Sequence, residues 1–159
     1  MPTQRLFVLV LLISGSLAMP LPAAVTVTHA DPDRFTDAGD RNSDPVKVMK
    51  EIEQHLKRLG DRYLPPNAEL KIEVLDLDRA GQARPPTDIR VMRGMSDIPC
   101  MDMRYTLAVD GKVTQSNRER VCDSDYLRRL PLRANESDPL AFEKRMIDEW
   151  FQERFAKGH

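Results

Sequence analysis

The sequence lacks the common signatures of catalysis. Its three histidines, His29, His55 and His159, are scattered, and no zinc-ligand spacing, nucleophile elbow or glycine-rich phosphate loop is present. Nothing in the residue pattern indicates a resident cofactor, so we predict none. These absences make a binding role the simplest expectation, although they identify no ligand.

The chain also lacks a block of charge of one sign. Its 24 Lys and Arg residues and 25 Asp and Glu residues are interspersed, and the formal net charge is −1. Proteins that bind nucleic acids or acidic membranes usually carry basic patches or stripes. The charge pattern therefore gives no reason to expect either partner.

No apolar run is long enough to cross a membrane, which takes roughly 18 or more residues. The run Leu6–Ile13 follows the basic residue Arg5 and precedes the small-residue stretch Ser16-Leu17-Ala18. This order is typical of a secretory signal peptide, and no cysteine stands nearby to accept a lipid. We predict that residues 1–24 form the peptide, with cleavage between residues 18 and 24. Residues 25–159 then form one periplasmic domain without a membrane span.

Hydrophobic spacing predicts the elements of the first half of that domain. Val25–His29 is β-branched and indicates a short strand. Ser43-Asp44-Pro45 is typical of a capped helix start, and Gly60 of a helix end. The stripe expected to be buried on this helix comprises Val46, Met49, Ile52, Leu56 and Leu59. Glu69–Asp78 alternates as a strand until its phase slips at Leu75, which favours a bulge.

The second half predicts a hairpin and a closing helix. Cys100–Val109 alternates, Asp110-Gly111 is a turn pair, and Lys112–Cys122 is polar enough for an exposed or edge strand. A loop precedes a short strand at Asp88–Met92. The final helix starts at Ser137-Asp138-Pro139, and its expected buried stripe comprises Leu140, Phe142, Met146, Ile147, Trp150, Phe151 and Phe155. The order β-α-β-β-β-β-α predicts a two-layer α+β fold, with a mostly antiparallel sheet and two helices on one face.

The two cysteines favour a disulfide, because an exported chain is oxidised more often than not. A two-residue Asp110-Gly111 turn sets Cys100 opposite Val121. A three-residue loop sets Cys100 opposite Cys122 instead and gives better cross-strand pairs, although the turn residues prefer the shorter loop. A bulge farther along the hairpin would reconcile the two registers. We predict a Cys100–Cys122 disulfide, with two buried free thiols as the alternative.

Aspartates supply the first candidate metal ligands, Asp31, Asp33 and Asp37, in the stretch DPDRFTDAGDR. A calcium loop needs a glycine at its sixth position and a bidentate acid at its twelfth, where this sequence has Thr36 and Asn42. A solvated loop that caps the following helix explains the same residues. A cation site here is therefore a weak alternative to a structural loop.

Two further groups could carry chemistry. Asp76 and Asp78 share one strand face and form a possible carboxylate pair, although strand ends outside a core look the same. The soft-ligand cluster Met92, Met95, Cys100, Met101 and Met103 would suit Cu(I). Core spacing explains Met101 and Met103 equally well, and a disulfide would remove the thiolate.

Several stretches together resemble one bacterial family. They are VTVT, DPDRFTDAGDR, RYLPP, IEVLDLDRAG, RYTL with DGKV, and DPLAFEKRMIDEWF. In this order they resemble the secreted proteobacterial family known as the domain of unknown function numbered three-zero-one-six. The resemblance implies a single-domain envelope protein and supplies no activity. Our leading hypothesis is a non-catalytic module that binds an envelope protein or small ligand. The alternative is a metal-dependent or hydrolytic enzyme that uses the clustered aspartates.

Overall fold

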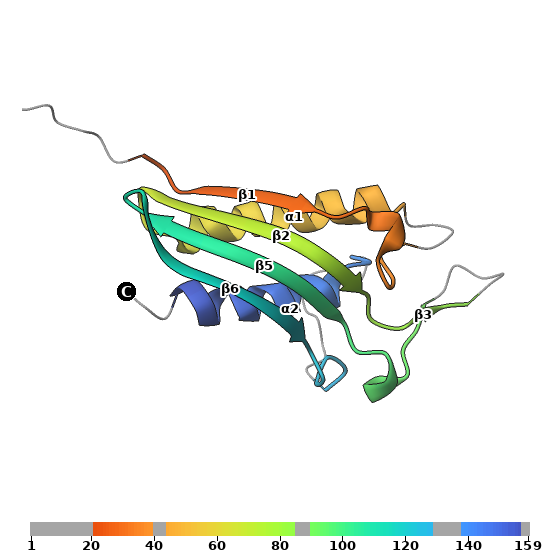
Figure 1. Cartoon of the computed structure of the whole chain (residues 1–159). Coiled ribbons are helices and arrows are strands. Elements are labelled where there is room, and N and C mark those ends of the chain that lie inside the picture. The colour runs from red at the N-terminus through yellow and green to blue at the C-terminus, as the bar shows by residue number, and fades with distance from the viewer. Residues whose placement is uncertain (1–20, 40–43, 85–89, 129–137, 157–159) are drawn as a thin grey trace, which may run out of the picture.

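The structure is a computed structural model that describes residues 21–39, 44–84, 90–128 and 138–156. Most of the predicted signal peptide, residues 1–20, therefore lies outside the described residues. The elements, in chain order, are β1 Ala24–His29, α1 Pro45–Tyr63, β2 Ala68–Asp78, β3 Gln82–Ala83, β4 Arg90–Val91, β5 Cys100–Val109, β6 Lys112–Cys122 and α2 Ala141–Phe151 (Figure 1). Short 3-10 turns occupy Pro32–Arg34 and Gly94–Ser96, and a π-helical turn, Gln152–Ala156, extends α2. No helix of the described residues is long and apolar enough to span a bilayer.

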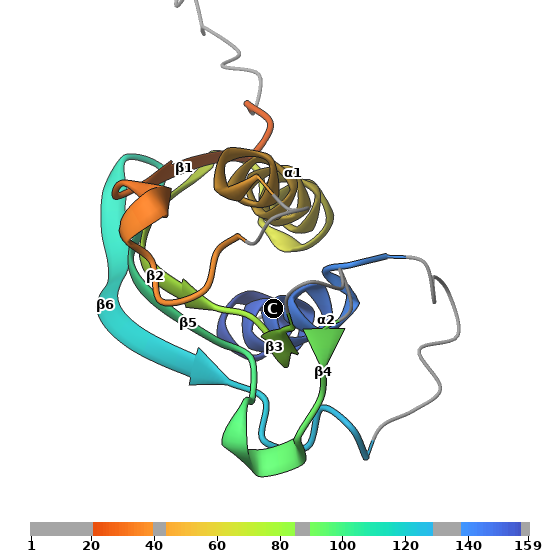
Figure 2. The same cartoon turned by 90° about the vertical axis from the view of Figure 1, so that its right-hand side faces the viewer.

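The predicted α+β class is confirmed. The main sheet has the order β1-β2-β5-β6, in which β1 is parallel to β2 and the other neighbours are antiparallel. Both helices lie on the same side of this curved sheet (Figure 2). The predicted order lacked β3, because Gln82–Ala83 was expected to be loop. Those residues pair with Arg90–Val91 in a separate two-stranded sheet.

Helix α1 buries one stripe against the sheet, with one correction to the prediction. Met49, Ile52, Leu56 and Leu59 are buried as expected, but Val46 is 60% exposed and Val48 is buried instead. Val46 lies in the first turn, next to the Asp44 carboxylate that accepts from its amide at 2.9 Å. The cap is thus correct, whereas the buried stripe begins two residues later.

Gly60 does not end α1, as the sequence suggested, because the helix continues to Tyr63. A Cβ atom at Gly60 would lie 2.0 Å from Cγ2 of Val25 on β1. Glycine therefore permits the close approach of helix and strand. The helix ends at Tyr63, with Leu64 as its C-cap, before the two prolines that cannot continue it.

Two bulges set the register of the sheet. On β2, Leu75 is the extra residue between Val74 and Asp76, as the phase slip predicted. The hairpin keeps the two-residue turn, with positive φ at Asp110 and Gly111. Thr114 is then an extra residue on β6, so Cys100 faces Cys122. The predicted two-residue turn and the predicted pairing of Cys100 with Cys122 are therefore both confirmed, and the disulfide is present.

Aromatic rings pack α2 against the sheet. Trp150 is 4% exposed and makes edge contacts with Tyr105 and Phe155, with ring centroids 5.6 and 5.4 Å apart. The rest of the predicted stripe is buried except Phe142, which is half-buried. His55 on α1 contacts Asp148 on α2 at 2.7 Å, which joins the two helices at their polar sides.

Candidate functional site

The face of the sheet opposite the helices is open, and its side chains follow from the strand register. One cross-strand row consists of Thr26, Lys71, Thr106 and Ser116. The adjacent row consists of Thr28, Glu73, Arg104 and Arg118. We call these eight residues the open-face rows. They come from all four strands and hold three cations, one carboxylate and four hydroxyl groups.

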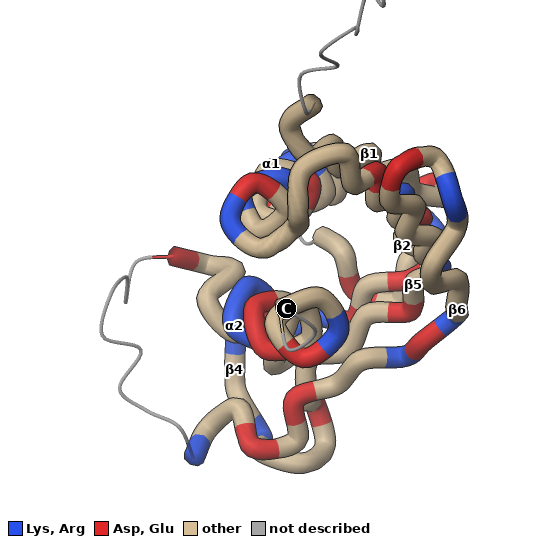
Figure 3. The backbone as a smooth tube through the Cα atoms, turned by 90° about the vertical axis from the view of Figure 1, so that its left-hand side faces the viewer, with Lys and Arg blue, Asp and Glu red and all other residues tan. Residues whose placement is uncertain are grey.

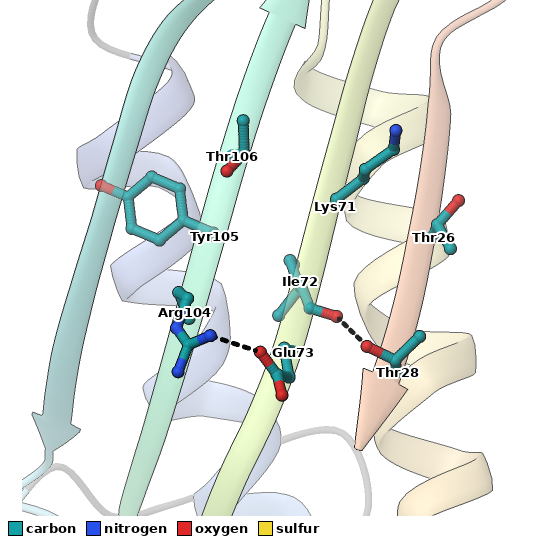
Figure 4. Close-up of a pocket in the computed structure, with 8 residues that line it drawn as sticks. All are labelled: Thr26, Thr28, Lys71, Ile72, Glu73, Arg104, Tyr105 and Thr106. Carbon is teal, nitrogen blue, oxygen red and sulfur yellow. Dashed lines mark hydrogen bonds and ion pairs between the residues drawn. The ribbon is translucent and has the colours of Figure 1, made fainter. Parts of the chain in front are cut away.

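A shallow groove of about 250 Å³ lies over β1, β2 and β5 on this face. Its labelled lining residues include Thr26, Thr28, Lys71, Glu73 and Arg104 (Figure 4). The Arg104 guanidinium pairs with Glu73 at 3.1 Å, and Lys71 pairs with Glu69 at 3.1 Å. Charged and hydroxyl groups from three strands are therefore available in the groove to a ligand.

Arg104 and Arg118 stand directly opposite each other on β5 and β6. Like charges in this position destabilise a sheet. In the described part of the chain, the Arg118 guanidinium has no carboxylate within ion-pairing distance. The neighbouring row is arranged differently, because Arg120 faces Asp102 and pairs with it at 3.3 Å.

Three of the sequence-predicted carboxylates come together at the end of β2. Asp37 forms a parallel bridge with Asp78, and its side chain pairs with Arg90. The Asp76 carboxylate accepts from the Thr36 amide at 2.7 Å and the Thr36 hydroxyl at 2.6 Å. Contacts within the fold thus engage both Asp37 and Asp76.

The pKa of Asp78 is raised in this cluster. Burial is the main cause, and the nearby charges of Asp37 and Asp76 add to it. Arg120 and Arg90 oppose the shift without cancelling it. A carboxyl group that holds its proton more tightly can act as a general acid, which is the chemistry the predicted pair would need.

Asp31 and Asp33 do not join this cluster through any contact of the described residues. The Asp31 side chain caps the 3-10 turn by accepting from the Asp33 amide at 3.2 Å. Within residues 21–39, 44–84, 90–128 and 138–156, no three His, Cys, Asp or Glu side chains are arranged to hold a metal ion. The proposed cation site at Asp31, Asp33 and Asp37 stays a prediction.

The fold gives three members of the soft-ligand cluster structural roles. The Cys100 sulfur is part of the disulfide, and Met101 and Met103 are buried in the core. Met95, by contrast, is 83% exposed. The core spacing of Met101 and Met103 therefore accounts for these two residues.

A second groove, of about 260 Å³, lies between β6 and α2. At its floor Glu119 accepts from the Trp150 indole at 3.0 Å and from Arg154 at 3.0 Å. Burial disfavours its charge, but the hydrogen bonds from Arg154, Trp150 and Tyr105 outweigh that effect, and the pKa of Glu119 is lowered. This carboxylate connects the edge strand to the C-terminal helix, so its contacts have a structural role.

Sequence reasoning missed two features of possible functional interest. Glu143 is 1% exposed, and burial raises its pKa, although the Ala80 amide donates to it at 2.8 Å. Glu143 lies three residues after Leu140 and four before Ile147, and this helical spacing could have predicted that it shares their buried face. The Arg104–Arg118 pair was visible once the Cys100–Cys122 register was chosen.

Comparison with known proteins identifies a family but no activity. Neither a curated protein nor a solved structure matches the chain. The family model described as "Protein of unknown function (DUF3016)" matches residues 23–153, which is most of the chain. The chain therefore belongs to the DUF3016 family.

Proposed function

We propose that this chain is an exported, non-catalytic binding domain of the bacterial envelope, which holds a partner against the open face of its sheet. The supporting observation is that the two helices cover only one face (Figure 2). The other face presents the open-face rows and their groove to solvent. Polar groups from four strands are thereby held rigidly on one surface, as a recognition site requires.

The free edge of β6 is a less suitable docking site than the face. Exposed edges can add a strand from a partner, but bulges and charged side chains obstruct such pairing. β6 has its bulge at Thr114 and carries Arg118, Glu119 and Arg120 in succession. These features favour a partner that contacts side chains over one that extends the sheet.

Export is part of the proposal, and the structure allows the N-terminal residue of the mature chain to be predicted. The Leu21 backbone amide donates to the Asn67 side-chain oxygen at 2.7 Å, and the Leu21 carbonyl accepts from the Asn67 backbone amide at 2.9 Å. Cleavage after Ala18 would preserve both bonds, whereas cleavage after Ala24 would remove them. Intact-mass analysis of periplasmic protein should give a chain that begins at Met19. Full-length chain in the cytosol would contradict export.

Site-specific crosslinking tests the binding role. A photoreactive amino acid placed at Thr106 should give one reproducible crosslinked species in intact cells. The same group at Lys50, which is exposed on α1, is the matched control and should give none. Equal crosslinking from both positions, or none from either, would contradict docking on the open face.

Acid–base chemistry at Asp78 is the second candidate function. It is favoured by the convergence of Asp37, Asp76 and Asp78 and by the raised pKa of Asp78. A panel of ester, phosphoester and glycoside substrates should reveal turnover that Asp78→Asn abolishes. Turnover that survives this substitution, or absence of turnover throughout the panel, would remove this candidate.

A further inference from the structure

The open-face rows contain more positive than negative charge, and this excess identifies a class of partner. We propose that the partner is a protein that places a carboxylate between Arg104 and Arg118. The inference rests on the proposed binding role and adds the chemistry of recognition. It makes Arg118 the main specificity-determining residue of the face.

The contacts of the two arginines carry the argument. The Arg104 side chain is 56% exposed and pairs with the Glu73 carboxylate at 3.1 Å. Arg118 faces Arg104 across the hairpin and makes no ion pair within the described residues. The described residues therefore supply a carboxylate to only one of these two adjacent guanidinium groups, and a carboxylate from a partner would supply the other. Such a group would remove the repulsion that the isolated domain retains.

The next row shows that the same strands can satisfy an arginine internally. Arg120 lies on β6 two residues from Arg118, on the same face, and its partner across the hairpin is Asp102. Arg118 lacks such an acidic partner across the hairpin, where the position is taken by Arg104. Positions 118 and 120 are thus equivalent in the strand but differ in their partners. This difference indicates that the positive charge of Arg118 serves binding and not folding.

The groups around the arginines suit a carboxylate. Guanidinium groups bind carboxylates through two parallel hydrogen bonds, which fixes orientation as well as charge. The hydroxyl groups of Thr106 and Ser116, in the adjacent row, are hydrogen-bonded to each other at 3.2 Å, so one of the two keeps its proton free to donate to a remaining lone pair of the carboxylate. A carboxylate bound here would thus meet charge and hydroxyl donors together.

The acids on the same face favour a protein surface over a uniformly anionic polymer or membrane. Glu69, Glu73 and Asp102 alternate with the cations of the open face. Across the whole chain, too, basic and acidic positions are interspersed (Figure 3). A dense array of phosphates would meet these carboxylates and be repelled, whereas a protein can present both signs in a complementary pattern.

Titration followed by NMR tests the inference on the mature chain. The probe is a short peptide that carries one Asp-Glu pair between glycines and serines, and its Asn-Gln analogue is the control ligand. We expect millimolar binding, as is usual for a few exposed ion pairs, with shifts of the Arg104, Thr106, Ser116 and Arg118 amides. The Asn-Gln peptide should not produce them, and added salt should weaken the binding.

Two matched variants separate specific recognition from general charge. Arg118→Gln should weaken peptide binding about fivefold, whereas Arg120→Gln should change it less than about twofold. Equal losses, or shifts scattered over the surface, would overturn the inference. Vesicles of phosphatidylethanolamine and phosphatidylglycerol form a third arm, and binding to them in preference to the peptide would also overturn it. Crosslinking from Thr106 that is unaffected by Arg118→Gln would leave the binding role intact while refuting the carboxylate partner.

Discussion

The two faces of the main sheet are built from the same strands but have different requirements. On β2, Leu70, Ile72 and Val74 point into the core and are almost fully buried, while Glu69, Lys71 and Glu73 point outward. The covered face is constrained by volume, because interiors are close-packed. The open face is free of that constraint, so its residues can be chosen for binding at little cost to folding. This difference predicts where substitutions will affect stability.

The largest expected effect is on the covered face. Trp150→Ala would remove a ring that packs against Tyr105 and Phe155 and would leave Glu119 without one of its donors. We expect a loss of about 3 to 5 kcal/mol in the free energy of unfolding. Thr106→Ala on the open face should change it by less than about 0.5 kcal/mol. Urea unfolding of both variants measures the contrast, and similar midpoints would refute it.

The disulfide should give the next largest effect, and it lies at the end of the open face. Cys100 and Cys122 are 22 residues apart and close the hairpin beyond Asp102 and Arg120. Replacing both with serine should cost about 3 kcal/mol, mainly because the unfolded chain gains freedom. Denaturation with and without reductant measures this, and the double variant should be insensitive to reductant. A wild-type midpoint that reductant does not change would contradict the expectation.

The sequence allowed most elements to be predicted because their signals are local. The cap at Asp44, alternation in β2 and β5, and the turn at Asp110-Gly111 all act within a few residues. The two possible hairpin registers could not be resolved in this way. Each was supported by a different local rule, and the bulge at Thr114 satisfies both. The predicted cap at Asp138 is wrong, because its carboxylate accepts from the Leu140 amide in the turn before α2, whose first residue is Ala141.

Several errors and omissions share a physical cause, which is contact between distant segments. Gly60 was predicted to end the helix, but its lack of a side chain instead lets β1 pack against α1 at Val25. The acidic cluster needs Asp37 to lie beside Asp78, which no short pattern can reveal. Similarly, Glu143 accepts from the amide of Ala80, far away in the sequence. Such features depend on tertiary packing and must be read from the structure.

Ionisation of Asp78, which lies near Asp37 and Asp76 at the end of β2, should lower the free energy of unfolding as pH rises. Because the folded-state pKa of Asp78 lies above its ordinary value of 3.8, the folded protein holds this proton more tightly than the unfolded chain does. That contribution is fully present below the unfolded pKa and is lost as pH rises through the folded pKa. Asp78→Asn should therefore raise the melting temperature relative to wild type at pH 7, and the gain should shrink toward pH 3.

The comparison for this experiment is Asp61→Asn, a substitution at an exposed position on α1. Melting curves of both variants between pH 3 and pH 8 separate the effect of the cluster from the general loss of a negative charge. A gain that is the same at every pH, or is equal for the two variants, would contradict a raised pKa at Asp78.

The smallest effect on stability should come from the facing arginines Arg104 and Arg118. The sign of the change shows whether Arg118 stabilises the fold or is free to serve binding. Arg118→Gln removes the repulsion with Arg104 and should stabilise the domain by about 0.2 to 1 kcal/mol. Arg120→Gln breaks the pair with Asp102 and should destabilise it by a similar or smaller amount. Urea midpoints at low and high salt measure both changes, which should shrink as salt screens the charges. If Arg118→Gln lowered stability instead, the arginine would serve the fold, and its position opposite Arg104 would no longer indicate selection for a partner.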